Sequence, residues 1–362
     1  MNGRYTAIII LFLSFLLFPS AVMAEEWVPV GIDQTAVRIT DAVVSGDGAY
    51  GAFVGNAGIM MLTADGAECW RIPDRRYRSL SLSGDGAVLA AGGDGILVMH
   101  QNTTVLAALK TKNYVNDLAI TADGSRIAVA LDDETLHLYS PKGDLVWSVD
   151  TVDDLISVAI SPDGTYIVGG TSAGNVVLFS DAGEERWTYG LSRKPVTAVA
   201  LSDNARTIAA ASADGTVALL SRAGSLLWSG SAPRAGGVAV TADGATVAIA
   251  DQKGIRFIQR DGTSEGQITT GDASVATAMD GSGRRILLTD GTRIKGFITK
   301  NTGPTEEAPL IEQVPEETVS TIATAHTQSP PVDTPVSTGT PFPIFPVVAA
   351  LIISARYVVR RL

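Results

Sequence analysis

The chain has 362 residues and a formal net charge of −11, so it lacks the basic surplus typical of nucleic-acid-binding proteins, and we expect no nucleic-acid partner. Its single cysteine excludes an intramolecular disulfide. Once the terminal segments described below are set aside, residues 25–299 remain, which are enough for one large domain but too few for two.

Residues 1–24 have the pattern of a secretory signal peptide. Arg4 precedes an apolar core from Ala7 to Phe18, and residues 22–24 supply small side chains for cleavage before Glu25. This core is short for a transmembrane helix, which needs about 20 apolar residues, so an uncleaved anchor is the alternative interpretation. The pattern predicts an exported protein.

The middle of the chain, residues 25–299, is built from a repeat that is clearest in residues 155–189. Runs rich in β-branched and aromatic residues predict four short strands there, at residues 155–160, 166–168, 176–179 and 186–189. Turns such as Asp163-Gly164 separate them, and Gly accepts the positive φ that these turns require. Four strands alone would leave open edges and an unburied face, so the unit needs neighbours.

The Asp of the first turn recurs every 38 to 40 residues, with Ser in the last repeat: Asp47, Asp85, Asp123, Asp163, Asp203, Asp243 and Ser282. Small residues recur on the first strand at Ala119, Ala159, Ala200, Ala239 and Ala278, and Trp recurs on the fourth at Trp70, Trp147, Trp187 and Trp228. Seven such units predict an all-β fold, a seven-bladed β-propeller of four-stranded blades. A β-sandwich with coincidental spacing is the alternative.

The N-terminal residues 25–31 look like a displaced fourth strand, because Glu25-Glu26-Trp27 resembles the start of the strand that contains Trp187. The last repeat ends after its third strand, expected at residues 294–298, and lacks a fourth. We therefore expect the N-terminal segment to pair with that third strand and close the ring, which removes two exposed sheet edges. A disordered N-terminal stub is the alternative.

The composition changes after residue 299. Residues 300–340 are rich in Pro, Thr, Glu and Ser, which predicts a disordered stalk. Residues 341–362 contain an apolar run followed by Arg356, Arg360 and Arg361, which predicts a C-terminal membrane anchor with the propeller outside the cell. Their order also resembles the sorting signals of prokaryotic surface proteins, so later removal of the tail is left open.

The loops between blades and the turns after the second strands are expected on one rim of the propeller. The basic and aromatic residues there form the candidate binding surface: Arg75, Arg76, Tyr77, Arg78, Lys110, Lys112, Tyr114, Arg193, Lys194 and Arg234. Such a rim suits an anionic glycan or an acidic protein patch, although ordinary solvated loop charge explains the same residues. Asn102 begins the glycosylation sequence Asn102-Thr103-Thr104 in a predicted turn.

Signals for catalysis are sparse. His100 and His137 lie on predicted third strands without metal-ligand partners at the usual spacing, and no nucleophile elbow or phosphate-binding glycine loop is present. We therefore expect no catalytic residue, metal or cofactor. Cys69 is expected to be a buried apolar residue, with a thiol for intermolecular pairing as the alternative.

The repeat resembles two related propeller families. Ser161-Pro162-Asp163-Gly164 is similar to the turn of exported WD-like repeats, and residues 140–147, 180–187 and 221–228 resemble the pyrroloquinoline-quinone-like repeat. The resemblance implies the architecture, and our hypothesis for function is a monomeric, non-enzymatic cell-surface module that binds a cell-envelope protein or glycan. Two alternatives are a quinone-dependent or other propeller enzyme, and an envelope-assembly factor that binds extended chains by strand addition.

Overall fold

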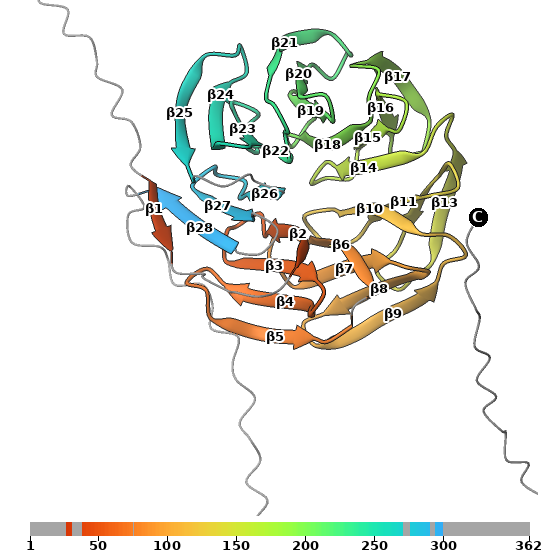
Figure 1. Ribbon diagram of the computed structural model, residues 1–362. Coiled ribbons are helices and arrows are strands. Elements are labelled where there is room, and N and C mark those ends of the chain that lie inside the picture. Colours follow the sequence, from red (N-terminus) through yellow and green to blue (C-terminus); the bar gives the residue numbers. More distant parts are fainter. Residues whose placement is uncertain (1–26, 31–37, 75, 271–275, 290–293, 300–362) are drawn as a thin grey trace, which may run out of the picture. The chain divides into compact units, whose positions relative to one another are not determined.

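The computed structural model describes residues 27–30, 38–74, 76–270, 276–289 and 294–299. The secondary structure of these described residues consists of β-strands, which form seven antiparallel sheets of four strands each. Six sheets use four consecutive strands each, and the seventh combines both ends of the repeat region. The predicted all-β propeller of four-stranded blades is confirmed (Figure 1).

The first three blades comprise β2 (Ile39–Val44), β3 (Tyr50–Gly55), β4 (Gly58–Thr63), β5 (Glu68–Ile72); β6 (Tyr77–Leu82), β7 (Val88–Gly93), β8 (Ile96–Gln101), β9 (Thr104–Lys110); and β10 (Val115–Ile120), β11 (Ile127–Leu131), β12 (Thr135–Tyr139), β13 (Leu145–Asp150). The next three comprise β14 (Leu155–Ile160), β15 (Tyr166–Thr171), β16 (Asn175–Ser180), β17 (Glu185–Gly190); β18 (Val196–Leu201), β19 (Ile208–Ser212), β20 (Thr216–Leu220), β21 (Leu226–Ser231); and β22 (Gly237–Val240), β23 (Thr246–Asp251), β24 (Gly254–Gln259), β25 (Ser264–Thr269). The composite sheet contains β26 (Ala276–Met279), β27 (Arg285–Thr289), β28 (Ile294–Thr299) and β1 (Trp27–Val30).

The first strand of each sheet lies innermost and the fourth lies outermost (Figure 1). The inner strands contribute the small residues predicted for the axis, and Ala119, Ala159, Ala200, Ala239 and Ala278 all line the central channel. Small side chains allow the inner strands to converge. The core fills the spaces between neighbouring sheets with Leu, Ile, Val and Ala.

The N-terminal strand closes the ring as predicted. β1 pairs antiparallel with β28, with Trp27 opposite Thr299 and Pro29 opposite Phe297 (Figure 1). The expected correspondence of Trp27 with Trp187 is wrong by two residues. Trp187 lies opposite Leu178, the fourth residue of β16, whereas the residue of β1 opposite the fourth residue of β28, Phe297, is Pro29.

In five of the seven sheets, the turn after the inner strand is held by a hydroxyl and, two residues later, a carboxylate. The Ser45 hydroxyl donates to Asp47 Oδ1 at 2.6 Å, and the backbone N–H groups of Ala49 and Tyr50 donate to Asp47 and Ser45 at 2.9 and 3.0 Å. The same arrangement recurs at Asp85, Asp123, Asp163 and Asp243. These aspartates therefore stabilise the turns.

Two repeats depart from this rule. In the last repeat the residues are exchanged, and the Ser282 hydroxyl donates to Asp280 at 2.7 Å. In the fifth repeat the equivalent residue is Asn204, which accepts from the Arg206 N–H at 3.1 Å, so the prediction of Asp203 was wrong by one position. Asp203 instead lines the channel, where burial, with the charges of nearby turn aspartates, raises its pKa.

Backbone hydrogen bonds link consecutive turns around the channel end. Each link joins one turn to the next, as in Asp47 N–H to Gly84 O at 3.0 Å, Gly84 N–H to Ala122 O at 2.7 Å and Ala122 N–H to Pro162 O at 3.0 Å. The Gly281 N–H donates to Gly46 O at 2.9 Å and so joins the last turn to the first. Pro162 has no N–H, so it donates no such bond to the following turn.

Two of the tryptophans, Trp147 on β13 and Trp187 on β17, fasten their outer strands to the next blade. Trp147 Nε1 donates to the Asp181 carbonyl at 2.8 Å, and Trp187 Nε1 donates to the Arg222 carbonyl at 2.9 Å. A Cβ at Gly183, which has a φ of +79°, would lie 3.2 Å from the Trp147 ring. The turn glycine therefore lets the indole pack flat on the neighbouring blade.

Several predictions concern residues outside the described part of the chain: the signal peptide at 1–24, the stalk at 300–340 and the anchor at 341–362. Within the described ranges, no helix has the length and hydropathy to span a bilayer.

Candidate binding surfaces and the central channel

The rim that carries the basic residues is assembled as expected. The turn after each second strand bonds to the loop that enters its own blade: Asn56 N–H to Arg38 O at 2.9 Å, Asp94 N–H to Arg76 O at 3.0 Å and Asp132 N–H to Tyr114 O at 3.0 Å. The loops between blades and the turns after the second strands therefore lie on one face.

The rim residues differ in how available they are. Six are exposed and form no ion pair with any described residue: Arg78, Lys110, Lys112, Arg193, Lys194 and Arg234. Arg76 is paired with Asp74 at 2.6 Å, and this pairing lowers the pKa of the Asp74 carboxyl. Tyr114 is half-buried, and Arg75 lies outside the described residues.

Tyr77 was predicted for this surface, and that prediction was wrong. Its side chain is only 4% exposed and packs in the core between the first two blades, next to Leu80. Tyr77 is the first residue of β6, so its ring points into the sheet interface rather than toward solvent. The basic rim therefore contributes cations without this aromatic partner.

Acidic residues interrupt the same rim at the third and fourth blades. Asp132 accepts from the Tyr114 N–H at 2.8 Å, Asp133 accepts from Thr135 Oγ1 at 2.5 Å, and Asp154 accepts from the Glu134 N–H at 3.2 Å. The carboxylates of Asp150 and Asp153 have no hydrogen bond or ion pair with any described residue. The rim thus contains an acidic sector in which two charges are unpaired.

The inner strands enclose a central cavity of about 570 Å³, lined mostly by small and apolar side chains. Two aspartates that sequence reasoning missed face it, Asp41 on β2 and Asp117 on β10. The Ser79 hydroxyl of the blade between them donates to Asp117 at 2.7 Å. With Asp203, the channel therefore carries three acidic groups among mostly small and apolar side chains.

Both aspartates fasten neighbouring blades. Asp41 accepts from the Leu80 N–H of the next blade at 3.0 Å, and Asp117 accepts from the Val158 N–H at 2.8 Å. Burial, together with the nearby Asp117 charge, raises the pKa of Asp41 to about 7, and burial raises the pKa of Asp117. The sequence contained a signal for these two residues. Both lie four positions before the turn hydroxyl, within an inner strand that is otherwise mostly apolar, so a carboxylate there is unusual.

Exposed apolar side chains gather on outer strands. In the described part of the chain, the large hydrophobic residues that are exposed are Val105 on β9, Leu145 and Val146 on β13, Leu226 on β21, and Val152 in the loop after β13. Three of them belong to β13 or follow it directly. Each outer strand also presents one edge with no strand paired to it.

Comparisons with known proteins agree with this architecture. Residues 132–286 match a repeat family described as the outer membrane protein assembly factor BamB. The chain is a β-propeller protein with pyrroloquinoline-quinone-like repeats. This propeller is also 32% identical over 87 residues to Actin-interacting protein 1 of Drosophila melanogaster, a match that covers 23% of the chain and 14% of that protein's length.

The propeller's histidines and cysteine supply no assembled reactive site. His100 is buried beside Trp70, and His137 contacts the Tyr139 hydroxyl at 2.9 Å; burial lowers the pKa of both imidazoles. Cys69 is exposed on β5, which corrects the expectation that it is buried. In the described ranges, no group of three or more His, Cys, Asp or Glu residues could hold a metal ion.

Asn102 lies in the turn between β8 and β9, as predicted, with a φ of +51° and an exposed side chain. The sequence pattern makes it a candidate for glycosylation.

Proposed function

We propose that this propeller is a non-enzymatic binding protein of the cell envelope, one that takes extended polypeptide segments at its outer strands during assembly of envelope proteins. The observation that carries the proposal is the concentration of exposed apolar side chains on outer strands, above all on β13. Leu145 is 51% exposed and Val146 is 42% exposed, and both lie at the start of β13, where a register shift interrupts its pairing with β12.

An outer strand of this kind is suited to strand addition. The free edge of β13 offers backbone N–H and C=O groups to a partner strand, and the apolar side chains beside it add contact area. The family match over residues 132–286 supports the assignment to envelope-protein assembly, because the family's description names that role. The signal and anchor patterns at 1–24 and 341–362 support an exported, membrane-anchored location.

The basic rim supports a second candidate, in which the propeller binds an anionic glycan or an acidic surface of an envelope protein. Six of its cations are exposed and free of ion pairs within the described ranges. Binding of this kind would weaken steeply with salt, whereas strand addition depends mainly on backbone hydrogen bonds and apolar contact. Both candidates are compatible with a monomeric propeller without a cofactor.

One experiment separates the two candidates. The full-length protein is titrated with a fluorescently labelled β-barrel envelope protein, supplied either unfolded from urea or folded. Strand addition predicts binding of the unfolded form alone, and at least a tenfold loss in an edge variant, Leu145→Lys/Val146→Lys. A rim variant, Lys110→Gln/Lys112→Gln, and a control on another outer strand, Gln267→Lys, should bind within twofold of the original protein.

Two results would contradict strand addition. Equal binding of the folded and unfolded forms would show that an extended chain is not what is recognised. A loss in the rim variant that follows salt concentration, with the edge variant unaffected, would move the function to the basic rim.

A further inference from the structure

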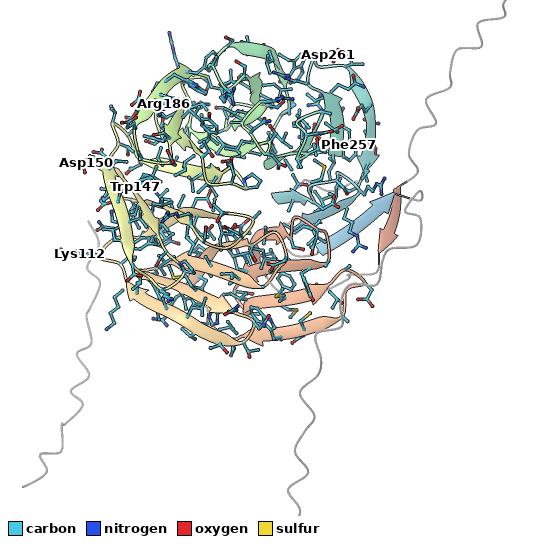
Figure 2. The ribbon with its side chains drawn as sticks, turned by 180° about the vertical axis from the view of Figure 1, so that it is seen from behind. Lys112, Trp147, Asp150, Arg186, Phe257 and Asp261 are labelled. Atoms are coloured by element: carbon cyan, nitrogen blue, oxygen red, sulfur yellow. The ribbon has the colours of Figure 1, made fainter. Side chains whose placement is uncertain are left out.

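The junction between the third and fourth blades contains a groove of about 280 Å³. One wall is the end of β13 with the loop at residues 151–154, and the other wall comes from β16 and β17. Its floor is apolar and consists of Val149, Leu155, Val177 and Phe179. Its rim is acidic and consists of Asp150, Asp153 and Glu185. Figure 2 shows Asp150 and Trp147 on the outer margin of the ring, where a partner can approach.

The size of the local side chains explains why a groove exists here. The fourth blade repeats the third at an offset of 40 residues, so Tyr189 and Leu191 correspond to Val149 and Thr151. In the fourth blade, Tyr189 and Leu191 pack against the core shared with the fifth blade and fill the equivalent space. Val149 and Thr151 are smaller, so the space between the third and fourth blades stays open.

The charges of the groove indicate what fits it. The carboxylates of Asp150 and Asp153 form no hydrogen bond or ion pair with any described residue, and the Glu185 carboxylate accepts from the Thr188 hydroxyl at 2.8 Å. Val152 lies between the two aspartates and is 89% exposed. Two unpaired carboxylates beside an apolar floor complement an aliphatic side chain next to an ammonium or guanidinium group, whereas an anion would be repelled.

We propose that this groove is the specificity site for the extended segments that the propeller binds, and that it selects an apolar residue with Lys or Arg two positions away, on the same face of the added strand. The proposal rests on the proposed strand addition at β13. Alternate residues of an added strand point to one face, and the face of β13 that carries Trp147 and Val149 borders the groove. A strand added at β13 therefore places every second side chain on the face that borders the groove.

The test uses three blocked seven-residue peptides of alternating Thr and Leu, in which the Leu two positions after the central Leu, on the same face of the strand, is replaced by Arg, Glu or Gln. Binding to the full-length protein is measured by fluorescence anisotropy at 50 mM and 500 mM salt. The Arg peptide should bind more tightly than the Gln peptide, and the Glu peptide should bind least. Asp150→Asn/Asp153→Asn should weaken the Arg peptide about three- to tenfold at low salt and have little effect at high salt.

Val149→Tyr tests the groove itself, because it copies the residue that the fourth blade uses at the same place and so preserves the fold. It should weaken the Arg peptide more than tenfold, and a thermal melt close to that of the original protein confirms folding. The matched control is Arg193→Gln/Lys194→Gln in the corresponding loop of the fourth blade, which should change binding less than twofold.

Three results would overturn the inference. The Glu peptide could bind as tightly as the Arg peptide, Val149→Tyr could leave binding unchanged, or sedimentation could show a dimer that Val149→Tyr dissociates, which would make a second copy the occupant. The groove proposal can fail while strand addition holds. In that case, unfolded envelope protein binds the original protein and the groove variants equally, and binding is lost only in Leu145→Lys/Val146→Lys.

Discussion

Replacing Asp41 by Ser should remove a large pH-dependent component from the stability of the propeller. The carboxyl lies in the central channel near Asp117, and its folded-state pKa is about 7 compared with 3.8 for an ordinary Asp. The fourth blade has Ser at the equivalent position, where Ser157 Oγ accepts a hydrogen bond from the Val199 N–H at 3.1 Å. The variant therefore keeps an acceptor for the bond to the next blade and loses only the titrating group.

The sign and size follow from the two pKa values. Between about pH 4 and pH 7 the folded state binds more protons at Asp41 than the unfolded state, so the free energy of unfolding falls as pH rises. This contribution is fully present below about pH 4 and is lost by about pH 8. A difference of about three pH units corresponds to about 4 kcal/mol. The carboxyl that folding keeps protonated must ionise beside Asp117 in an apolar channel at higher pH.

The assay is urea unfolding followed by tryptophan fluorescence at half-unit steps from pH 4.5 to 8. Turn aspartates with lowered pKa values, such as Asp163 and Asp243, give an opposite trend, but they are present in both proteins and cancel in the difference. The Asp41→Ser variant should gain stability relative to the original protein as pH rises. A control, Asp261→Asn on an exposed turn visible in Figure 2, should not show that gain. A difference between Asp41→Ser and the original protein that stays constant within about 0.5 kcal/mol would refute the argument.

Two further predictions concern how the blades are joined. Deleting Trp27–Val30 should destabilise the protein by about 2–4 kcal/mol, because it removes the backbone ladder of β1 and exposes the edge of β28; an unchanged melting temperature would contradict ring closure. Trp187→Ala should cost about 2–3 kcal/mol in urea unfolding, because it removes a half-buried indole and its hydrogen bond to the Arg222 carbonyl, whereas Gln267→Ala on the outer strand β25 should cost less than about 0.5 kcal/mol.

The architecture was predictable because it depends on features that every repeat shares. The apolar run at residues 155–160 is β14 with the same bounds, and the Asp-Gly turns, the small residues at the axis and the tryptophans all have the roles expected of them. The second and third strands extend further than predicted, to Thr171 and from Asn175, because Thr171 pairs with Leu155 of β14 and Asn175 pairs with Gly190 of β17. Pairing across the sheet overrides the preference of single residues.

The errors in the turns of the fifth and last repeats came from aligning the repeats on the position of a single Asp. Asp203 keeps the 40-residue spacing from Asp163, but the turn is built by Ser202 and Asn204, because an extra residue precedes it. The Ser and Asp of the last turn exchange places and preserve the same hydrogen bond, which a search for Asp at one position cannot detect. A hydrogen-bonded pair is the unit that the repeats conserve, and the spacing of a single residue is a poorer guide to it.

Binding residues were harder to predict because charge alone does not report burial or pairing. Arg76 and Tyr77 are neighbours in the sequence, yet one is exposed and paired with Asp74 and the other is in the core. Conversely, the carboxylates of Asp150 and Asp153 have no partner among the described residues, whereas Asp132, Asp133 and Asp154 nearby each accept a hydrogen bond. Such differences arise from the three-dimensional arrangement of loops that the sequence leaves far apart.

The positions where one repeat departs from its neighbours are therefore the best places to look for function in this propeller. Seven sheets of similar sequence must all supply packing and turns, so shared residues are explained by stability. Val149 and Thr151 leave a space that Tyr189 and Leu191 fill in the next blade, and Asp41 and Asp117 place carboxyls where Ser157 serves elsewhere. A space or a charge that the fold does not require in the other blades is free to be selected for a ligand, and in the third blade it lies beside an exposed apolar strand.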